Sequence, residues 1–553
     1  MQTPAKDLKP TMTVHALAEE TLFPPESEIP SHLRIDPPIH QNYSLSSGTL
    51  VPWPGPLTPV ESPIRLLRGS DLVPKMLGFS PRLSMEASRE AFEAAHRAYD
   101  AGSGHWPMLG LEGRCEVLEQ FADRMQAVRD EVVRLLMWEI AKPFEEAEDE
   151  FDRTLGYIHD TVDAVREGMA RNLSLFHQEG FVARCGRAPL GVVLSMGPYN
   201  YPLNETFATL IPALLMGNTL VMKPPRLGVL LNQPLLPAFR DLFPPGVVNI
   251  IYGHGEEIIP PIIQSGELNG LAFVGSAGVG AELLRSHPHP NRLTAILGLE
   301  AKNAAIVLPD ADLEVAAEEI TRGAFTYNGQ RCTAIKIVFV HRRIAERFLN
   351  LLAEAADRLV VGPPWAPDVQ ITPMAEVSRA EYLAEAIHEA RELGADIVNH
   401  NGGHVRENYV YPTIIYPASP DARLYREEQF GPVLPVIPFV HRETPLKYLK
   451  SGRYGLQASL FGTDPDSLAE MIQPMLGLVG RVNLNSQCQR GPDVLPFSAR
   501  KDSGLGTLSV TEALQAFSLP VTVAGRATEI NHALFHAMTN GGSAPFLSSA
   551  FPP

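Results

Sequence analysis

A single thiol in the stretch Tyr327-Asn328-Gly329-Gln330-Arg331-Cys332-Thr333-Ala334 is the group in this chain best suited to nucleophilic chemistry. A cysteine attacks a carbonyl carbon when its thiolate is favoured and the resulting oxyanion is stabilised. Gly329 and Gln330 beside it predict a loop that small molecules can approach. Taken alone, Cys332 fits a small buried residue better, which is the usual place of a free cysteine. Its assignment as a nucleophile therefore depends on other parts of the chain.

Four further stretches complete a pattern of which this one is a part. They are Gly197-Pro198-Tyr199-Asn200-Tyr201-Pro202-Leu203, Gly217-Asn218-Thr219-Leu220-Val221-Met222-Lys223-Pro224, Phe273-Val274-Gly275-Ser276-Ala277-Gly278-Val279-Gly280 and Glu428-Gln429-Phe430-Gly431-Pro432-Val433. One such string is weak evidence, but five in this order, spread over residues 85–520, are specific. In this pattern the chain resembles the aldehyde dehydrogenase superfamily.

The resemblance implies a role for each of these residues. Cys332 would attack an aldehyde, and the Asn200 amide and the Cys332 backbone N–H would hold the oxyanion. Hydride transfer to a nicotinamide would leave a thioester, which water then hydrolyses. Without the pattern, Asn200 would be a turn former, the glycines loop residues and Glu428 a solvated charge. The residues implied for cofactor binding are Pro198, Lys223, Gly275, Ser276, Glu428 and Phe430.

Arg226 indicates which nicotinamide cofactor the chain uses. The resemblance places Lys223 against the adenosine ribose, and many relatives that prefer NAD have an acid three positions later. Here that position is Arg226. A cation suits a 2'-phosphate and removes the repulsion that a carboxylate would exert. The prediction is NADP, with NAD not excluded.

Within the superfamily the chain is most similar to the non-phosphorylating, NADP-dependent glyceraldehyde-3-phosphate dehydrogenases. In that family a tyrosine and arginines bind the substrate phosphate, which implies the same role for Tyr201, Arg331, Arg490 and, on a less specific match, Arg153. Guanidinium groups donate hydrogen bonds to phosphate in pairs. The alternative for each arginine is a surface ion pair. The motifs that carry the likeness are Asn200-Tyr201, Lys223-Pro224-Pro225, Gly329-Gln330-Arg331-Cys332, and Gln489-Arg490-Gly491-Pro492-Asp493 followed by Phe497 and Lys501-Asp502-Ser503-Gly504.

One motif departs from the family pattern. Hydrolytic aldehyde dehydrogenases have a Glu-Leu-Gly-Gly-Lys run whose glutamate activates water, whereas this chain has Leu297-Gly298-Leu299-Glu300-Ala301-Lys302-Asn303. Aligned on Lys302, the glutamate position is Gly298. Glu300 lies two residues later, on the same face of an extended segment but displaced by about 6–7 Å. Glu300 is therefore predicted to be the general base, and the alternative is that it only forms a local ion pair.

Three functions stay open at this point. The first is oxidation of glyceraldehyde 3-phosphate, or a similar small anionic aldehyde, to the carboxylate. The second is an acylating enzyme that passes the thioester to coenzyme A, or a different semialdehyde dehydrogenase. The third is a binding or structural protein that keeps the fold without activity. The presence of Cys332, Asn200 and Glu428 together argues against the third.

The composition excludes several other classes of protein. The chain has 553 residues, 45% of them hydrophobic, and a formal net charge of -17, which disfavours binding to nucleic acid or an anionic membrane. No apolar run approaches the ~18 residues of a membrane span. The four cysteines have no paired metal-ligand or disulfide spacing. We expect a cytoplasmic protein that needs no metal.

Cys488 lies two residues before Arg490, on a loop expected to line the substrate entrance. An oxidative partnership with Cys332 is one interpretation. An incidental small residue is the preferred one.

Apolar residues spaced by three and four predict helices over 84–100 and 111–141, and a third helical segment follows over 143–169. Short apolar runs then alternate with helical segments, which predicts an α/β fold built from parallel βαβ units. The runs expected to be strands are Gly191-Met196, Thr219-Lys223, Val247-Tyr252 and Leu271-Val274.

The expected domain organisation combines these elements with the resemblance. Proline-rich residues 1–80 are predicted to form an irregular arm. Residues 81–299 would form a Rossmann-like cofactor domain, interrupted by a hairpin at 173–187, and residues 300–500 a catalytic domain. Residues 501–553 would be an oligomerisation segment and tail. Together with the hairpin they would join copies of the chain into a homodimer or homotetramer.

Overall fold

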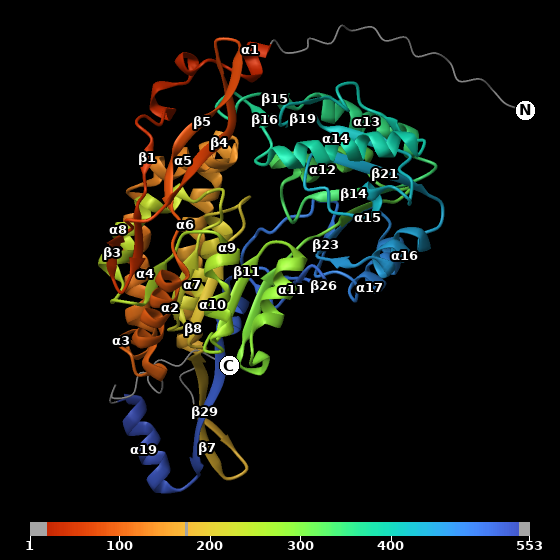
Figure 1. Ribbon diagram of the computed structural model, residues 1–553. Coiled ribbons are helices and arrows are strands. Elements are labelled where there is room, and N and C mark those ends of the chain that lie inside the picture. The colour runs from red at the N-terminus through yellow and green to blue at the C-terminus, as the bar shows by residue number, and fades with distance from the viewer. Residues whose placement is uncertain (1–18, 172–174, 541–553) are drawn as a thin grey trace, which may run out of the picture.

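The computed structural model describes residues 19–171 and 175–540, which are organised around two large β-sheets (Figure 1). One sheet has eight strands and the other seven. The chain passes from the first to the second between β12 (Thr294–Gly298) and β13 (Asn303–Val307). Both sheets are largely parallel and are packed against helices, so the predicted α/β fold is confirmed.

The first sheet has a parallel centre in the order β12-β11-β8-β9-β10. The chain runs outwards from β8 (Val192–Met196) through β9 (Thr219–Lys223) and β10 (Val248–Ile250), and then returns to the other side of β8 with β11 (Gly270–Val274). Ligands of such sheets bind at the carboxyl ends of the strands where the order reverses. The loops after β8 and β11 are therefore expected at one site. All four predicted strands are confirmed.

In the second sheet, the loop that carries the Cys332 thiol lies at the amino end of a buried strand. Its order is β17-β20-β21-β14-β13-β23-β24, and all neighbours pair in parallel except β17 with β20. The loop before β14 (Ile335–His341) carries Cys332, and the loop before β21 (Val433–Phe439) carries Glu428. The remaining strands are β17 (Asp396–Ile397), β20 (Thr413–Tyr416), β23 (Gln457–Phe461) and β24 (Arg481–Leu484).

The predicted helices form on their apolar stripes. They are α2 (Met85–Tyr99), α4 (Leu111–Gln126), α5 (Arg129–Ile140) and α6 (Phe144–Arg171). The single helix expected over 111–141 is two, because the backbone of Val128 leaves the helical conformation at φ -114° and ψ 17°. No helix in the described part of the chain has both the length and the apolar character needed to cross a bilayer.

The expectation of an irregular arm is wrong for much of the N-terminal region. A hairpin of β2 (Tyr43–Ser46) and β3 (Thr49–Pro52) extends the first sheet, and a longer hairpin of β4 (Leu57–Arg68) and β5 (Asp71–Pro81) packs nearby. The prolines of β4 misled the prediction because β4 is an edge strand, where a missing N–H is tolerated. Residues 1–18 lie outside the described part.

The predicted hairpin projects from the body of the protein (Figure 1). Its strands are β6 (Phe176–Gln178) and β7 (Phe181–Pro189), and β29 (Ser518–Arg526) pairs along the whole of β7. The segment expected to assist the hairpin in oligomerisation therefore pairs with it directly. It is followed by a helix, α19 (Glu529–Asn540), and residues 172–174 and 541–553 lie outside the described part.

Candidate functional site

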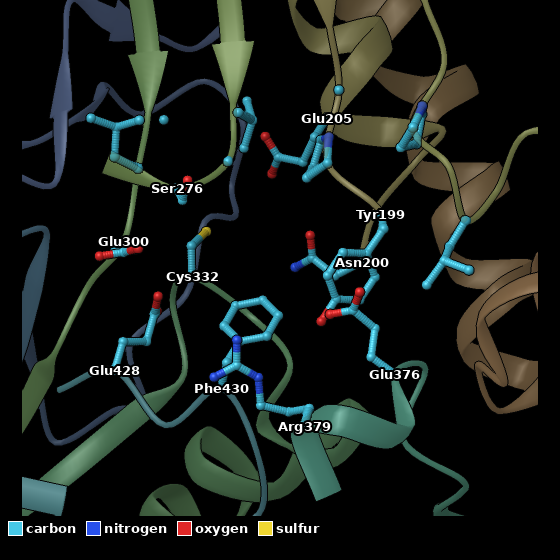
Figure 2. Close-up of a pocket in the computed structure, with 18 of the residues that line it drawn as sticks. Tyr199, Asn200, Glu205, Ser276, Glu300, Cys332, Glu376, Arg379, Glu428 and Phe430 are labelled. Carbon is cyan, nitrogen blue, oxygen red and sulfur yellow. The ribbon is translucent and has the colours of Figure 1, made fainter. Parts of the chain in front are cut away.

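A cavity of about 650 Å³ brings loops of both sheets together around Cys332. Figure 2 shows Cys332 in this cavity with Asn200, Glu205, Glu300 and Glu428 around it. The predicted site residues that line the cavity are Pro198, Asn200, Arg226, Gly275, Ser276, Glu300, Cys332, Glu428 and Phe430. They come from stretches far apart in the sequence, so the fold assembles most of the predicted site.

The loop that carries Cys332 has an unusual backbone. Tyr327, Asn328 and Gly329 all have positive φ, at 48°, 55° and 67°. A Cβ on Gly329 would lie 2.6 Å from the Ala324 carbonyl oxygen, so only glycine fits there. The chain consequently turns sharply just before the thiol.

Two side chains then fix the Cys332 backbone. Asn303 Nδ2 donates to the Cys332 carbonyl oxygen at 2.8 Å, and Lys336 Nζ donates to the same atom at 3.0 Å. These two hydrogen bonds fix the position of the Cys332 backbone, and the Cys332 side chain lines the cavity.

Burial raises the pKa of the Cys332 thiol to about 11, and the nearby Glu205 carboxylate raises it further, while Lys336 and Arg490 act in the opposite direction. A thiol with this pKa is protonated at neutral pH. To act as a nucleophile, the thiol must therefore lose its proton before or during attack.

The Asn200 side chain is oriented beside the thiol loop. Its Nδ2 donates one hydrogen bond to the Gln330 carbonyl oxygen at 2.7 Å. A side-chain amide has two N–H donors, so the second is available to an oxyanion. The Asn200 backbone is held by Lys142 Nζ, which donates to its carbonyl oxygen at 2.9 Å.

Lys142 belongs to a buried support that sequence reasoning missed. It forms an ion pair with Glu150, and both side chains are fully buried. Glu150 also accepts hydrogen bonds from the backbone N–H groups of Leu203 and Asn204, each at 3.1 Å. The pair therefore ties helix α6 to the Asn200 loop.

Glu300 lines the cavity two residues beyond the end of β12. The Tyr454 hydroxyl donates to its Oε2 at 3.5 Å, which is a long contact. Among the described residues Glu300 forms no salt bridge, so the alternative of a local ion pair finds no support there. A Cβ at Gly298 would lie 3.3 Å from Val274 Cγ2, so a side chain fits there with only a small shift.

Glu428 is a buried carboxylate on the same cavity. It pairs with Lys336 Nζ at 2.9 Å and accepts a hydrogen bond from the Ala301 N–H at 3.2 Å. Burial nevertheless keeps the pKa of Glu428 above its ordinary value. Phe430, at φ 44°, places its ring 6.0 Å from that of Tyr199.

A second cavity, of about 680 Å³, adjoins the first and is lined by Lys223 and Arg226. Burial lowers the pKa of Lys223 to about 8, and Arg226 Nη2 lies 2.9 Å from Glu376 Oε1. Ser276 caps helix α11 (Ala277–Ser286), and helix N-termini attract phosphate. The second cavity is lined by two cations and the adjoining first cavity by the start of a helix, an arrangement that fits a phosphorylated dinucleotide.

The four residues predicted to bind the substrate phosphate do not line any of these cavities. Arg153 forms a bidentate pair with Asp493, at 2.9 and 2.7 Å, and Arg490 pairs with Glu205. Arg331 Nη2 donates to the carbonyl oxygens of Arg322 and Gly323. Tyr201 is packed 3.6 Å under Lys142 Nζ. The arginines were predicted to bind the substrate phosphate, but each is already engaged by groups of the protein itself.

Glu205 is the main residue that sequence reasoning missed. It lies in the first turn of α7 (Asn204–Leu215), a helix in which every residue is buried, and it lines the cavity with Cys332. The signal was available, because Glu205 is the single charged residue in that helix. Glu376 was missed as well, since nothing near it in the sequence resembles a motif.

The expected place of Cys488 is wrong. Its side chain is fully buried in a hydrophobic cluster, and its Sγ lies 3.2 Å from Ser459 Oγ rather than at the cavity surface. The preferred interpretation of an incidental small residue agrees with this position.

Comparisons with known proteins agree on one family. The pattern of the aldehyde dehydrogenase family matches residues 75–523. The NADP-dependent glyceraldehyde-3-phosphate dehydrogenase of Streptococcus equinus is 34% identical over 80% of this chain and 91% of its own length. A malonate-semialdehyde dehydrogenase of Geobacillus kaustophilus is 28% identical over 79% of the chain and 88% of its own. The crystal structure of the NADP-dependent glyceraldehyde-3-phosphate dehydrogenase of Bacillus halodurans, complexed with NADP, superposes with a TM-score of 0.79 at 30% identity and covers 88% of this chain and 100% of that one.

Proposed function

Because the chain belongs to the aldehyde dehydrogenase family, we propose that it oxidises glyceraldehyde 3-phosphate, or a similarly small anionic aldehyde, to the carboxylate with NADP. The observation that carries the proposal is the juxtaposition of the Cys332 thiol and the Asn200 amide on one cavity. The relatives named above for this aldehyde support the choice of substrate.

Two cationic side chains of this protein support NADP as the cofactor. Lys223 and Arg226 would supply the positive charge that a 2'-phosphate needs, and Gly275 and Ser276, beside the start of α11, would bind the pyrophosphate. Glu428 and Phe430 are the residues that would hold the nicotinamide end. NADP supplies a hydride acceptor when it is bound.

The first half of the reaction belongs to Cys332. Its sulfur forms a bond to the aldehyde carbon as the thiol passes its proton to solvent water, and the carbonyl oxygen takes the negative charge. The free Asn200 N–H and the Cys332 backbone N–H stabilise that oxygen. Once the hydride has left the carbon, Cys332 holds the acyl group as a thioester.

Glu300 is proposed to complete the reaction. It would take a proton from water while the water oxygen bonds to the acyl carbon, after which the carbon–sulfur bond breaks and the Cys332 thiolate is restored. A Glu300→Gln variant should then show a burst of NADPH followed by slow turnover in stopped-flow absorbance at 340 nm. An unaltered steady rate in this variant would contradict the role.

The preference for a phosphorylated substrate is tested by replacing two of the arginines predicted to bind the phosphate. Replacing Arg331 and Arg490 by Leu should greatly reduce kcat/KM for glyceraldehyde 3-phosphate and leave that for unphosphorylated glyceraldehyde much less affected. If turnover of the phosphorylated aldehyde is unchanged, the phosphate assignment is wrong.

A second candidate is a semialdehyde dehydrogenase that acylates coenzyme A. The position of Gly298 favours it, because the water-activating glutamate of the family pattern is absent there, and a similar protein is named for malonate semialdehyde. Assays with a panel of aldehydes, with and without coenzyme A, separate the two. Product formation that requires coenzyme A would replace the first proposal.

The projecting sheet is proposed to join copies of the chain in a homodimer or homotetramer. Several of its side chains are large, apolar and exposed, which is typical of an interface. They are Phe176, Phe181, Leu519, Val521 and Val523. Light scattering of a Leu519→Asp/Val523→Asp variant should show a smaller particle than the parent protein.

A further inference from the structure

Glu205 lies between the reacting thiol and an arginine expected to bind the substrate. Its carboxylate lines the cavity around Cys332 (Figure 2). It also lines a smaller cavity of about 30 Å³, to which Cys332 contributes as well. That smaller cavity is otherwise lined mostly by apolar side chains such as Phe497 and Leu508. Among the described residues that line it, Glu205 is the single charged side chain.

Arg490 lies behind this wall. Its guanidinium pairs with Glu205, packs 4.9 Å from the centre of the Phe497 ring, and is almost fully buried, with 5% of the side chain exposed. Its Nη2 has no hydrogen-bond partner among the described residues. A buried guanidinium nitrogen without a partner retains the capacity to bind another anion.

Arg490 belongs to a cluster of two arginines and two carboxylates. Asp493 Oδ1 lies 3.3 Å from Arg490 Nε, and Asp493 is shared with Arg153. Two arginines therefore face two carboxylates, and the formal charges of these four side chains sum to zero. Of its four members, only Glu205 reaches the cavity surface.

We propose that Glu205 determines the charge specificity of the aldehyde site, because it occupies Arg490 in place of an anionic group of the substrate. An aldehyde with a phosphate has to displace this carboxylate before it can reach the guanidinium. An uncharged hydroxyaldehyde meets no such competition, since its hydroxyls can donate to Glu205. The inference rests on the proposed function and assigns to one residue the balance between phosphorylated and uncharged aldehydes at that site.

The sign of the effect follows from Coulomb's law. A fixed carboxylate beside the path of a dianion opposes its binding, and the opposition is strong where water is excluded. Glutamine has nearly the same shape and keeps an oxygen that accepts a hydrogen bond from Arg490, but it has no charge. Removing the charge should therefore favour the phosphorylated aldehyde selectively.

The test compares glyceraldehyde 3-phosphate with glyceraldehyde as substrates of the full-length protein and its Glu205→Gln variant, with NADP. We expect the ratio of the two kcat/KM values to shift toward the phosphorylated aldehyde by at least tenfold, mainly through its KM. A merely structural role would lower both values together and leave the ratio unchanged, which would overturn the proposal.

Binding of the stable acids gives a readout without turnover. Calorimetric titration with 3-phosphoglycerate and with glycerate should show that Glu205→Gln tightens the binding of the first about tenfold more than that of the second. The control is Glu119→Gln, which removes one carboxylate from an ion pair with Arg166 on the helical surface. This control should change neither ratio.

Failure of the proposed function is distinguishable from failure of this inference. If the parent protein oxidises neither aldehyde, the proposed reaction is wrong, while the titrations still report on Glu205. If the parent oxidises glyceraldehyde 3-phosphate but Glu205→Gln leaves both ratios unchanged, the specificity role of Glu205 is wrong and the reaction stands.

Discussion

Two arginine–carboxylate pairs flank the cavity around Cys332, and their surroundings are opposite. Arg226 and Glu376 lie on the wall shared with the neighbouring cavity, where 69% and 29% of their side chains are exposed. Arg490 and Glu205 lie beside the small apolar cavity, where 5% and 10% are exposed. Both arginines were predicted from the sequence to bind a phosphate, one of the cofactor and one of the substrate.

The difference in exposure changes what each pair can do. An exposed pair contributes about 0–1 kcal/mol, so an incoming phosphate opens it at little cost. A buried pair is held by its surroundings, because separating it leaves an uncompensated charge out of water. A phosphate that binds the exposed arginine would therefore open a weak ion pair, whereas one that binds the buried arginine would first have to separate it from its carboxylate.

The largest expected effect tests the buried pair. Arg490→Leu leaves Glu205 buried beside an apolar side chain, and the loss of one partner of a buried pair lowers the free energy of unfolding by about 3–5 kcal/mol. Arg226→Leu should lower it by less than about 1 kcal/mol. Urea denaturation followed by circular dichroism measures both.

A double variant separates the charge from the packing. Glu205→Leu/Arg490→Leu removes both members and should recover most of the stability lost in Arg490→Leu, because no unpaired charge remains between them. Equal stabilities of the Arg490→Leu and Arg226→Leu variants would contradict the distinction between the pairs.

The next effect concerns the exposed pair and the cofactor. Arg226→Glu places a carboxylate beside Glu376, so the 2'-phosphate of NADP is repelled and the ribose hydroxyls of NAD gain an acceptor. We expect the ratio of kcat/KM for NADP to that for NAD to fall about 100-fold. Steady-state assays with each cofactor give this ratio, and a variant that keeps its preference for NADP would refute the role of Arg226.

The two pairs also show what the sequence predicts well and what it does not. The motifs located Cys332, Asn200 and the parallel strands, because local backbone and apolar runs determine them. The ion pair between Arg490 and Glu205 could not be predicted from local sequence, because the two residues are 285 positions apart in the chain. The prolines of β4 were misread for a related reason, because only the tertiary fold decides which strand is at an edge.

A smaller effect is expected in the reactivity of the thiol. The pKa of Cys332 is about 11, so alkylation by iodoacetamide should accelerate about tenfold per pH unit between pH 8 and 10 as the thiolate fraction grows. Glu205 raises that pKa, and Glu205→Gln therefore lowers it and speeds alkylation at pH 8 by several-fold. Mass spectrometry of the peptide that contains Cys332 measures the rate, and Glu376→Gln should leave it unchanged.

The smallest effect is expected when the exposed pair is opened without adding a charge. Glu376→Gln releases Arg226 from its ion pair, so Arg226 meets the 2'-phosphate without competition, and NADPH should bind about two- to fivefold more tightly because exposed pairs are weak. Fluorescence titration with NADPH and NADH measures this, with NADH as the control that has no 2'-phosphate. In an Arg226→Ala background the same substitution removes only the repulsion between Glu376 and the 2'-phosphate, which isolates that repulsion from the release of Arg226. Equal tightening of NADPH and NADH, or a gain as large as the tenfold change expected at Glu205, would mean that exposure does not separate the two pairs.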